Sequence, residues 1–484
     1  MMTTRFRLIQ VACVWVVLIA HSPSGVNANE VVARTSGGDL RAGAAVADIT
    51  PPLGELVVGG FEPFPAAVIH DKLHARCLVL DDGRTQLGFV ICDSVGIPRE
   101  IIDEAREEIA EQTTLLPQNV LMAATHTHSA TRANTEKYRP VLVRGIVESV
   151  RLAMANLEPA KIGWSGIDEP SQVFNRRWYV SDPDLRRNPY GGVDQVRMNP
   201  VRNHPSLVKP AGPIDPEISV LSVQSSDGRP IAVLANYSLH YVGNVNKGDV
   251  SADYFGVFAE RIAELLDTKS ANPPFVGLLT NGTSGDINNV NFREPRSSEE
   301  RYEKINLVAD LVANHVKEAC DNIEYNEHVT LGSQHRELTL KRRKPDATTR
   351  NYIAEVLAKS DDSPTYHAQE RYHGAAAQRQ FEGPDEVAVP LQAFRIGNLA
   401  IAALPFEVFV EIGLELKEKT PFADTFTIEL ANSSEGYLPT PAQHELGGYE
   451  TWLGTNRVQK DASVLIVEQV LDMFNQLAKE PAVK

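Results

Sequence analysis

Residues 120–128 read Val-Leu-Met-Ala-Ala-Thr-His-Thr-His, so five apolar residues are followed directly by two closely spaced histidines. The apolar run predicts a buried strand. Because side chains in a strand alternate between its two faces, His126 and His128 are expected on the same side, at the end of that strand. Neutral imidazole is the commonest nitrogen ligand of zinc, so the pair indicates either a metal site or one ligand beside one acid-base group. The alternative is two strand-end histidines that hydrogen-bond to the backbone.

Segments of strand and helix character alternate on both sides of this stretch. Residues 44–52 predict a strand closed by a proline turn, and the Asp-Asp-Gly step at residues 81–83 predicts a hairpin between two apolar runs. Residues 100–112 and 141–156 carry apolar side chains at helical spacing. This alternation predicts an α/β fold, which we expect to be one large domain with a mixed β-sheet core flanked by helices.

Two later segments repeat the pattern. Residues 231–237 predict a strand that leads to His240, and Ser251 is the expected N-cap of the helix that follows. Residues 275–279 predict another strand, which runs into a glycine-rich turn at residues 281–286. Because α/β sheets keep their sites at strand ends and in the loops after them, we expect the chemistry of this protein to lie in these loops.

The last third of the chain has a different composition. Residues 341–390 are rich in charged and polar side chains, which predicts a polar surface insertion with some helix. Residues 393–404 return to strand character, and residues 408–418 predict an amphipathic helix. Glu407 is then expected at the N-terminus of that helix, where the helix dipole favours an anionic side chain. Such a position suits a metal-binding carboxylate.

The composition excludes one large class of partners. Of the 484 residues, 43% are hydrophobic and 23% are charged, which is ordinary for a soluble globular protein. The formal net charge is −16 at pH 7. Proteins that bind nucleic acids usually carry a basic surface, so no nucleic-acid partner is expected.

The first 28 residues predict an export signal. Two arginines precede an apolar stretch at residues 8–20, and small residues at 26–28 offer a cleavage site. An uncleaved anchor is the alternative, but about 13 apolar-rich residues are short for a membrane span of roughly 20. We therefore expect a secreted or periplasmic protein that is soluble or only peripherally associated with a membrane. The mature chain would consist of a polar leader at residues 29–42 and one domain over residues 43–480.

The cysteines do not form a metal or redox motif. Cys13 lies in the predicted signal, and Cys77, Cys92 and Cys320 remain without CxxC spacing. Cys77 and Cys92 lie in two apolar runs that predict neighbouring strands. They are therefore expected either to form a disulfide or to remain as buried thiols.

Several separated motifs occur in a fixed order over residues 43–475. They are Ala45-Val46-Ala47-Asp48-Ile49-Thr50, Ala124-Thr125-His126-Thr127-His128-Ser129, Asn175-Arg176, His240, Ser251 with Asp253, Pro405-Phe406-Glu407, and Tyr437 with Thr440 and Tyr449. The histidine tetrapeptide is the most specific, and the others gain weight from their order. Together they resemble the N-terminal catalytic domain of the neutral (alkaline, non-lysosomal) ceramidases.

The resemblance implies a zinc-dependent amidohydrolase that splits the N-acyl bond of ceramide. Ceramide or a related N-acyl lipid is then the leading candidate substrate, and smaller N-acyl compounds remain open. Two histidines and one carboxylate are what a catalytic zinc ion binds, with a further position left for water. Zinc would lower the pKa of that water to roughly 7, so that it can attack an amide carbonyl. By this resemblance the zinc ligands are His126, His240, Glu407 and Tyr437, and His128, Arg176 and Tyr449 line the reaction centre.

Four of these roles have simpler alternatives. Taken alone, Glu407 would be a carboxylate at the start of a helix and His240 a hydrogen-bonded core histidine. Arg176 is followed by a second arginine, so a surface ion pair is the alternative for this side chain. For Tyr449 the alternative is plain packing. His128, expected on the same strand face as His126, would pass a proton to the departing amine.

The chain departs from the pattern of the family at three places. Asn288 stands where the family has a serine proposed to act in catalysis. This disfavours a serine nucleophile, leaves a zinc-activated water unaffected, and gives Asn288 the role of orienting substrate or water. Residues 129–131 read Ser-Ala-Thr in place of Ser-Gly-Pro. The chain ends at Lys484, before the C-terminal immunoglobulin-like domain of typical members is expected.

Two other functions are compatible with these residues. The first is a metal-dependent ester or phosphoester hydrolase, because the same metal geometry polarises an acyl or a phosphoryl oxygen. The second is a catalytically silent lipid-binding or carbohydrate-binding protein that has kept the fold, for which Asn288 is the supporting departure.

Overall fold

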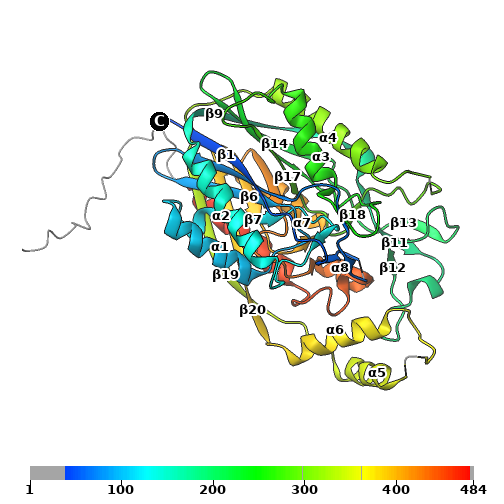
Figure 1. Ribbon diagram of the computed structural model, residues 1–484. Coiled ribbons are helices and arrows are strands. Elements are labelled where there is room, and N and C mark those ends of the chain that lie inside the picture. The colour runs from blue at the N-terminus through cyan, green and yellow to red at the C-terminus, as the bar shows by residue number, and fades with distance from the viewer. Residues whose placement is uncertain (1–38, 61, 297, 361, 480–484) are drawn as a thin grey trace, which may run out of the picture. The chain divides into compact units, whose positions relative to one another are not determined.

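The computed structural model describes residues 39–60, 62–296, 298–360 and 362–479 (Figure 1). The predicted export signal and most of the predicted leader lie outside these residues. The short apolar runs of the sequence pair into two sheets, and the segments with helical spacing pack on the outer faces of these sheets.

An eight-stranded mixed sheet forms the centre of the fold, as the sequence predicted. Its strands, in spatial order, are β17 (Val276–Asn281), β15 (Pro230–Tyr237), β14 (Glu217–Ser225), β9 (Glu158–Asp168), β1 (Arg41–Asp48), β5 (His74–Asp81), β6 (Gln86–Cys92) and β7 (Val120–Ala124). Neighbours run antiparallel except at the two edges, where β15 pairs with β17 and β6 with β7 in parallel. The predicted hairpin at residues 81–83 is confirmed, since it joins β5 to β6 with Asp81 opposite Gln86.

A second sheet of four strands packs against the first. Apolar side chains from the two sheets meet in one buried cluster. The alternation along β5 shows how: Leu78 and Leu80 belong to this cluster, whereas Cys77 and Val79 belong to the cluster under the helices on the other face. The second sheet consists of β19 (Leu331–Lys341), β20 (Glu386–Ile396), β21 (Leu399–Ala403) and β23 (Asp424–Ile428).

Helices cover the outer faces of both sheets, which gives a layer order of helix, sheet, sheet, helix (Figure 1). Each helix buries its apolar stripe against the sheet beneath it. The eight-stranded sheet is covered by α1 (Arg99–Gln112), α2 (Arg139–Ala155), α3 (Asp253–Leu265) and α4 (Glu303–Asp321), and the four-stranded sheet by α7 (Val410–Lys419) and α9 (Ala462–Lys479).

The insertion predicted at residues 341–390 lies between two paired strands, except that residues 386–390 belong to the second of them. β19 and β20 pair along their whole length, and the chain leaves the sheet after Lys341 and returns opposite it at Glu386. The chain between them forms α5 (Ala347–Ala358) and α6 (Glu370–Glu382), which Figure 1 shows beside the layers rather than within them.

Short elements connect these layers, and three of them carry residues of the site described below. They are β2 (Leu56–Val58), β3 (Phe64–Pro65), β4 (Val68–Ile69), β8 (Ala130–Thr131), β10 (Phe174–Asn175), β11 (Arg177–Val180), β12 (Val196–Met198), β13 (Leu207–Pro210), β16 (Asp249–Val250), β18 (Ile287–Asn288), β22 (Glu407–Val408), β24 (Tyr437–Leu438) and α8 (Pro441–Leu446).

Two local predictions gain detail from the structure. The strand character predicted at residues 393–404 is confirmed, but it belongs to two strands, because β20 ends at Ile396, Gly397 turns with φ +59°, and β21 returns antiparallel to β20. Glycine tolerates this left-handed conformation, so the Gly-Asn step was the overlooked turn signal. The helix for which Ser251 was the expected N-cap begins one residue later, at Asp253. Ser251 Oγ accepts a hydrogen bond from the N–H of Asp253 at 3.1 Å.

The three cysteines of the described chain are free thiols. Of the two alternatives for Cys77 and Cys92, the structure therefore has the buried thiols, and burial raises the pKa of both. In the part of the chain that the structure describes, no helix combines the length and the apolar character needed to span a membrane.

Candidate metal centre and active site

The two histidines that follow β7 lie just beyond the end of that strand. Hydrogen bonds of 2.9 Å join the N–H groups of Thr125 and His126 to Cys92 O and Ser94 O. His126 itself has φ +66°, in the left-handed region. The prediction that strand alternation aligns the two imidazoles is therefore wrong. A reversal of the backbone at His126 brings the rings together instead, with 3.0 Å between the Nε2 atoms of His126 and His128.

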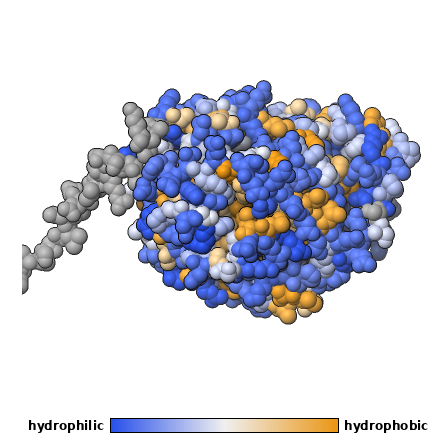
Figure 2. All heavy atoms as spheres, turned by 90° about the horizontal axis from the view of Figure 1, so that it is seen from above, coloured by the Kyte–Doolittle hydropathy of each residue, from blue (hydrophilic) through white to orange (hydrophobic). Residues whose placement is uncertain are grey.

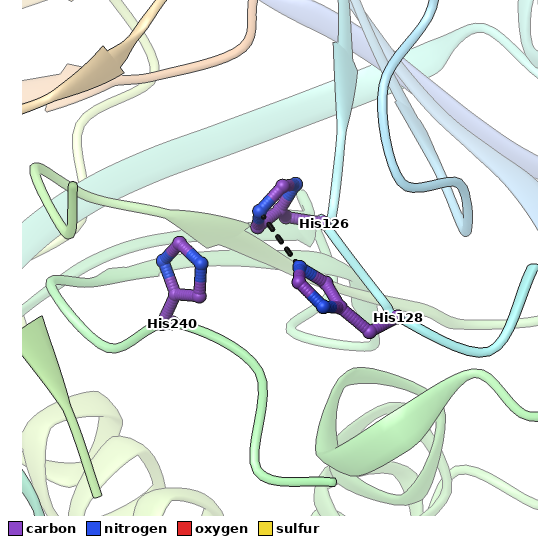
Figure 3. Close-up of side chains that lie close together, drawn as sticks. All are labelled: His126, His128 and His240. Atoms are coloured by element: carbon purple, nitrogen blue, oxygen red, sulfur yellow. Dashed lines mark hydrogen bonds between the residues drawn. The ribbon is translucent and has the colours of Figure 1, made fainter. Parts of the chain in front are cut away.

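His240 joins this pair from the other half of the central sheet. It lies in the loop after β15 and is 1% exposed. One nitrogen from each of His126, His128 and His240 lies within 4.8 Å of the others. Figure 3 shows the three rings gathered around a common space. Imidazole groups that converge in this way can bind a divalent metal ion.

The hydrogen bonds of the rings determine where their lone pairs point. Nδ1 of His126 lies 2.5 Å from Val95 O, and Nδ1 of His240 lies 3.2 Å from Ser284 O. A carbonyl oxygen can only accept, so each Nδ1 carries the hydrogen and each Nε2 presents a lone pair. A backbone carbonyl on the distal nitrogen is the usual support of a metal-binding histidine.

Glu407 and Tyr437 reach the histidines through a parallel pairing of two short strands. β22 and β24 place Glu407 beside Tyr437 in register, so their side chains point to the same side. Glu407 Oε2 lies 3.4 Å from His126 Nε2 and 3.7 Å from His240 Nε2. The prediction that Glu407 stands at a helix N-terminus is wrong, because α7 begins only at Val410.

Two buried polar atoms at this point have no hydrogen-bond partner among the described residues. They are His240 Nε2 and Glu407 Oε2. Leaving a buried polar atom unpaired costs about 1–3 kcal/mol, so the pair indicates a missing partner. Ligand atoms around a tetrahedral zinc ion lie roughly 3.3–3.6 Å apart. The separations between Glu407 and the two histidines are close to this range, and the donor set therefore fits a divalent metal ion.

The charges of the centre also favour a cation. Burial lowers the pKa of His128 and of His240 well below the usual value, and the neighbouring His126 lowers both further. Burial acts on His126 in the same direction, but Glu407 outweighs it and raises the pKa of His126. Burial alone would raise the pKa of Glu407, and His126 lowers it overall. An ionised carboxylate thus stands near two imidazoles, those of His128 and His240, that are held neutral, which is the environment that attracts a metal ion.

Arg176 lies beside the centre and is 4% exposed, so it is not the surface ion-pair residue of the alternative interpretation. Its Nη2 donates to Tyr437 Oη at 3.1 Å, and its Nε donates to Glu450 at 3.0 Å. Glu450 is fully buried and also accepts from Arg177 Nη1 at 2.7 Å. One buried carboxylate therefore holds two adjacent arginines, and no sequence pattern indicated a role for Glu450 or Arg177.

The remaining predicted residues lie next to the same centre. The ring of Tyr449 lies 5.7 Å from the ring of Tyr437, centroid to centroid. Asn288 lines a cavity of about 850 Å³ together with Arg176 and His240. Its Nδ2 donates to Asn199 Oδ1 at 2.7 Å, and its Oδ1 accepts from the N–H of Val290 at 2.9 Å, so the amide is held in one orientation. All eight predicted site residues thus share one neighbourhood.

A buried pair behind His240 was not predicted. Ser284 Oγ donates to Glu429 Oε1 at 2.6 Å and lies 3.2 Å from His240 Nδ1. Glu429 Oε2 accepts from the N–H of Val408, next to Glu407, at 2.7 Å. Burial raises the pKa of Glu429 to about 8. The glycine-rich turn at residues 281–286 was a signal for Ser284, whereas no local pattern distinguishes Glu429.

Comparison with known proteins gives one consistent result. A family model described as "Neutral/alkaline non-lysosomal ceramidase, N-terminal" matches residues 40–303. The neutral ceramidase of Mycobacterium tuberculosis is 22% identical over 495 residues, which covers 85% of this chain and 73% of that protein. Neutral ceramidase A of Dictyostelium discoideum is 23% identical over 279 residues, or 52% of this chain and 36% of that protein.

Solved structures resemble this fold over nearly the whole chain. The neutral ceramidase of Pseudomonas aeruginosa superposes with a TM-score of 0.69 at 20% identity, covering 92% of this chain and 75% of that one. A structure described as ceramidase complexed with C2 gives 0.70 at 17% identity, covering 92% and 76%. At this level of identity the likeness shows the shared fold.

Proposed function

Because the chain belongs to the neutral/alkaline non-lysosomal ceramidase family, we propose that it is a hydrolase that cleaves the N-acyl amide bond of ceramide or of a related N-acyl lipid. The observation that carries this proposal is the convergence of His126, His240 and Glu407 beside a cavity that His240 and Arg176 line. Amide hydrolysis requires a polarised carbonyl and an activated water, and a metal centre next to a substrate-sized cavity suits both needs.

We infer that the centre holds a divalent ion, with zinc as the first candidate. The proposed ligands are His126, His240, Glu407 and Tyr437, and the unpaired Nε2 and Oε2 atoms support this set. When bound, such an ion supplies Lewis acidity that lowers the pKa of water and polarises an acyl oxygen. His128 lies within reach of the same point and is the competing ligand.

The other side chains would handle charge and protons. Arg176, oriented by Glu450, is placed to stabilise the negative charge that develops on the amide oxygen as water adds to the carbonyl carbon. His128 would take a proton from the attacking water and give it to the amine nitrogen as the C–N bond breaks. Tyr449 would supply a further hydroxyl donor, and Asn288 would orient the substrate. The products are a carboxylate and an amine.

Metal content and turnover, measured on the same preparations, test these assignments. His126→Ala is expected to lose both bound metal and amidase activity, because it removes a ligand. His128→Ala is expected to keep the metal and lose about 10²–10⁴-fold in kcat, the usual contribution of a general acid-base group. His328→Ala, an exposed histidine with a side chain 62% accessible, is the matched control and should change neither. Full metal occupancy and activity in His126→Ala would reject the proposed centre.

The reaction class needs a separate assay. The purified metal-loaded protein should hydrolyse N-acyl amides in a panel that also contains carboxyl esters and phosphomonoesters. Activity confined to phosphomonoesters would replace the amidase proposal by the phosphoester hydrolase. A protein that retains its metal but turns over no member of the panel would point to the silent binding protein.

We also propose that the protein is exported and that residues 1–28 are its cleaved signal. The support is the arginine-led apolar stretch at residues 8–20. N-terminal sequencing of protein recovered from outside the cytoplasm should then begin at Asn29. An intact Met1 on the recovered protein would contradict cleavage.

A further inference from the structure

The cavity beside the metal centre has a wall that differs from the wall expected around a neutral two-chain lipid. Sites for hydrophobic ligands are lined predominantly by apolar and aromatic side chains. Here most of the lining side chains are polar or charged, and the apolar and aromatic ones are Pro200, Val201, Tyr241, Val242, Val290 and Phe292. On the face that Figure 2 draws, hydrophobic areas are likewise separated by hydrophilic side chains.

Three cations in this wall have no acidic partner among the described residues. Arg202 and Lys304 are half-buried and Arg296 is exposed, and all three line the cavity. Glu299 is the one acidic side chain among the described residues of the wall. An excess of positive charge here is notable because the whole chain carries a net charge of −16. Cations left unpaired at a cleft attract an anionic ligand.

The neutral part of the wall is polar as well and is held in place. Four asparagines line the cavity. Asn288 bonds to Asn199, and Asn289 Nδ2 donates to Val242 O at 3.3 Å. Asn244 Nδ2 donates to Glu300 O at 2.9 Å. Fixed amide groups of this kind suit a hydrogen-bonding headgroup better than a hydrocarbon chain.

We propose that, among N-acyl amides, the preferred substrate carries an anionic group on its amine half, and that Arg202, Arg296 and Lys304 recognise this group. The proposal rests on the proposed amidase function and names its substrate class: an N-acyl amino acid or an N-acyl aminosulfonate rather than neutral ceramide. Hydrolysis then releases a fatty acid and an amine that retains its acidic group. The cations act on binding and leave the bond cleavage itself to the residues described above.

A pair of substrates with the same acyl chain tests this on the metal-loaded protein. N-lauroyltaurine is the anionic member and N-lauroylethanolamine the neutral one. In the variant Arg202→Gln/Arg296→Gln/Lys304→Gln, kcat/KM for N-lauroyltaurine should fall about 10–100-fold, because the attraction between cleft and ligand is lost. The value for N-lauroylethanolamine should stay within about twofold of the wild type. Added salt should weaken the reaction of the anionic substrate alone.

A matched control removes three cations elsewhere. Lys72, Lys137 and Lys269 have side chains 68%, 77% and 73% exposed and do not line the cavity, so their triple glutamine variant should leave both substrates unaffected. Equal losses for the two substrates in the cleft variant would overturn the inference. So would a wild-type preference for the neutral substrate.

A binding measurement separates this inference from the amidase proposal. If neither substrate is hydrolysed, the proposed function fails. Calorimetric titration with N-lauroyltaurine then decides the inference by itself, with binding expected to be at least about tenfold weaker in the cleft variant than in the wild type. Equal affinity of the two proteins would reject the anion site.

Discussion

Glu450 is the residue on which the arrangement of Arg176 and Arg177 most depends. Its two oxygens accept from the two guanidinium groups, and all three side chains are buried. Backbone carbonyls also accept from both arginines, but only the carboxylate balances their charge, so removing it leaves two buried cations without their shared anion. Glu450 therefore matters for stability because it is buried between two arginines, not because it is a glutamate.

Glu450→Ala is therefore expected to cost about 3–5 kcal/mol of unfolding free energy, since it leaves two buried charges unpaired. Urea denaturation followed by circular dichroism measures the loss. The control is Glu148→Ala, which breaks an exposed pair with Arg151 and should cost less than about 1 kcal/mol. Equal effects of the two substitutions would contradict the buried network.

Ser284 supports His240 from behind the metal centre. Its hydroxyl hydrogen is used on Glu429, so its oxygen is free to accept from His240 Nδ1. Ser284→Ala should weaken metal affinity about 10–100-fold, the usual effect of losing a group that orients a ligand. Competition with a chelator of known affinity measures this. Ser149→Ala, another buried serine whose hydroxyl donates to Ile146 O on α2, should leave metal affinity unchanged.

At the residue scale, the sequence predicted which side chains lie together better than it predicted their geometry. His126, His240, Glu407 and Tyr437 were predicted together from the ordered motifs, and the structure brings them together. The reason given for aligning His126 with His128 was wrong, because it assumed that strand geometry continues past Ala124. A left-handed residue other than glycine carries no clear sequence signal, so the reversal could not be foreseen.

At the scale of elements, the sequence predicted what is encoded locally and missed what depends on distant pairing. β7, β15 and β17 follow from continuous apolar runs, and α1 and α2 from helical spacing. β22 is only two residues long, and it exists because it pairs with β24 far along the chain. The placement of Glu407 failed for this reason: a local pattern shows the helix that follows but not the partner strand.

The α6 helix of the insertion packs against the loop at residues 449–454, and a buried histidine of α6 makes part of this contact. The ring of His373 lies 5.9 Å from Tyr449 and 5.1 Å from Trp452, centroid to centroid. Neither of its ring nitrogens has a hydrogen-bond partner among the described residues. Burial, with a contribution from His367, lowers the pKa of His373 to about 4. This histidine must therefore be neutral for α6 to stay packed against the loop.

Acid should loosen this contact. In the unfolded chain His373 binds a proton below about pH 6.5, whereas the folded protein resists protonation down to about pH 4. Its contribution to stability is therefore complete above pH 6.5 and is lost as the pH falls toward 4. Between pH 7.5 and pH 5 this amounts to about 2 kcal/mol. His373→Phe should lose less unfolding free energy than the wild type over this interval. The control His328→Phe, at an exposed position, should lose as much as the wild type. If the unfolding free energy of all three proteins fell equally with pH, the assignment to His373 would be contradicted.

At the scale of the whole molecule, the layered α/β architecture followed from the alternation of strands and helices. What the alternation could not show is how loops from separate regions meet at one point. The proposed ligands come from the loop after β7, the loop after β15, β22 and β24. These segments are far apart in the sequence, so a bound ion would connect distant parts of the chain through the interior.

Metal removal should accordingly destabilise the fold as well as stop the reaction. A ligand present at about 1,000 times its Kd stabilises the folded state by about 4 kcal/mol, because the unfolded chain does not present the site. Chelation should therefore lower Tm by several degrees in a thermal melt. In His126→Ala, which is expected to start without metal, chelator should not change Tm. An unchanged Tm in wild-type protein shown to have lost its metal would contradict a linking role.

The backbone of His126 has a consequence for anyone who engineers this protein. The left-handed conformation suits glycine or asparagine and costs a histidine roughly 1–2 kcal/mol. A campaign that selects metal-free protein only for heat resistance would thus be rewarded for replacing His126, which is one of the proposed metal ligands. Variant libraries of this protein should keep His126 unchanged, or every thermostabilised variant should be assayed for turnover before it is kept.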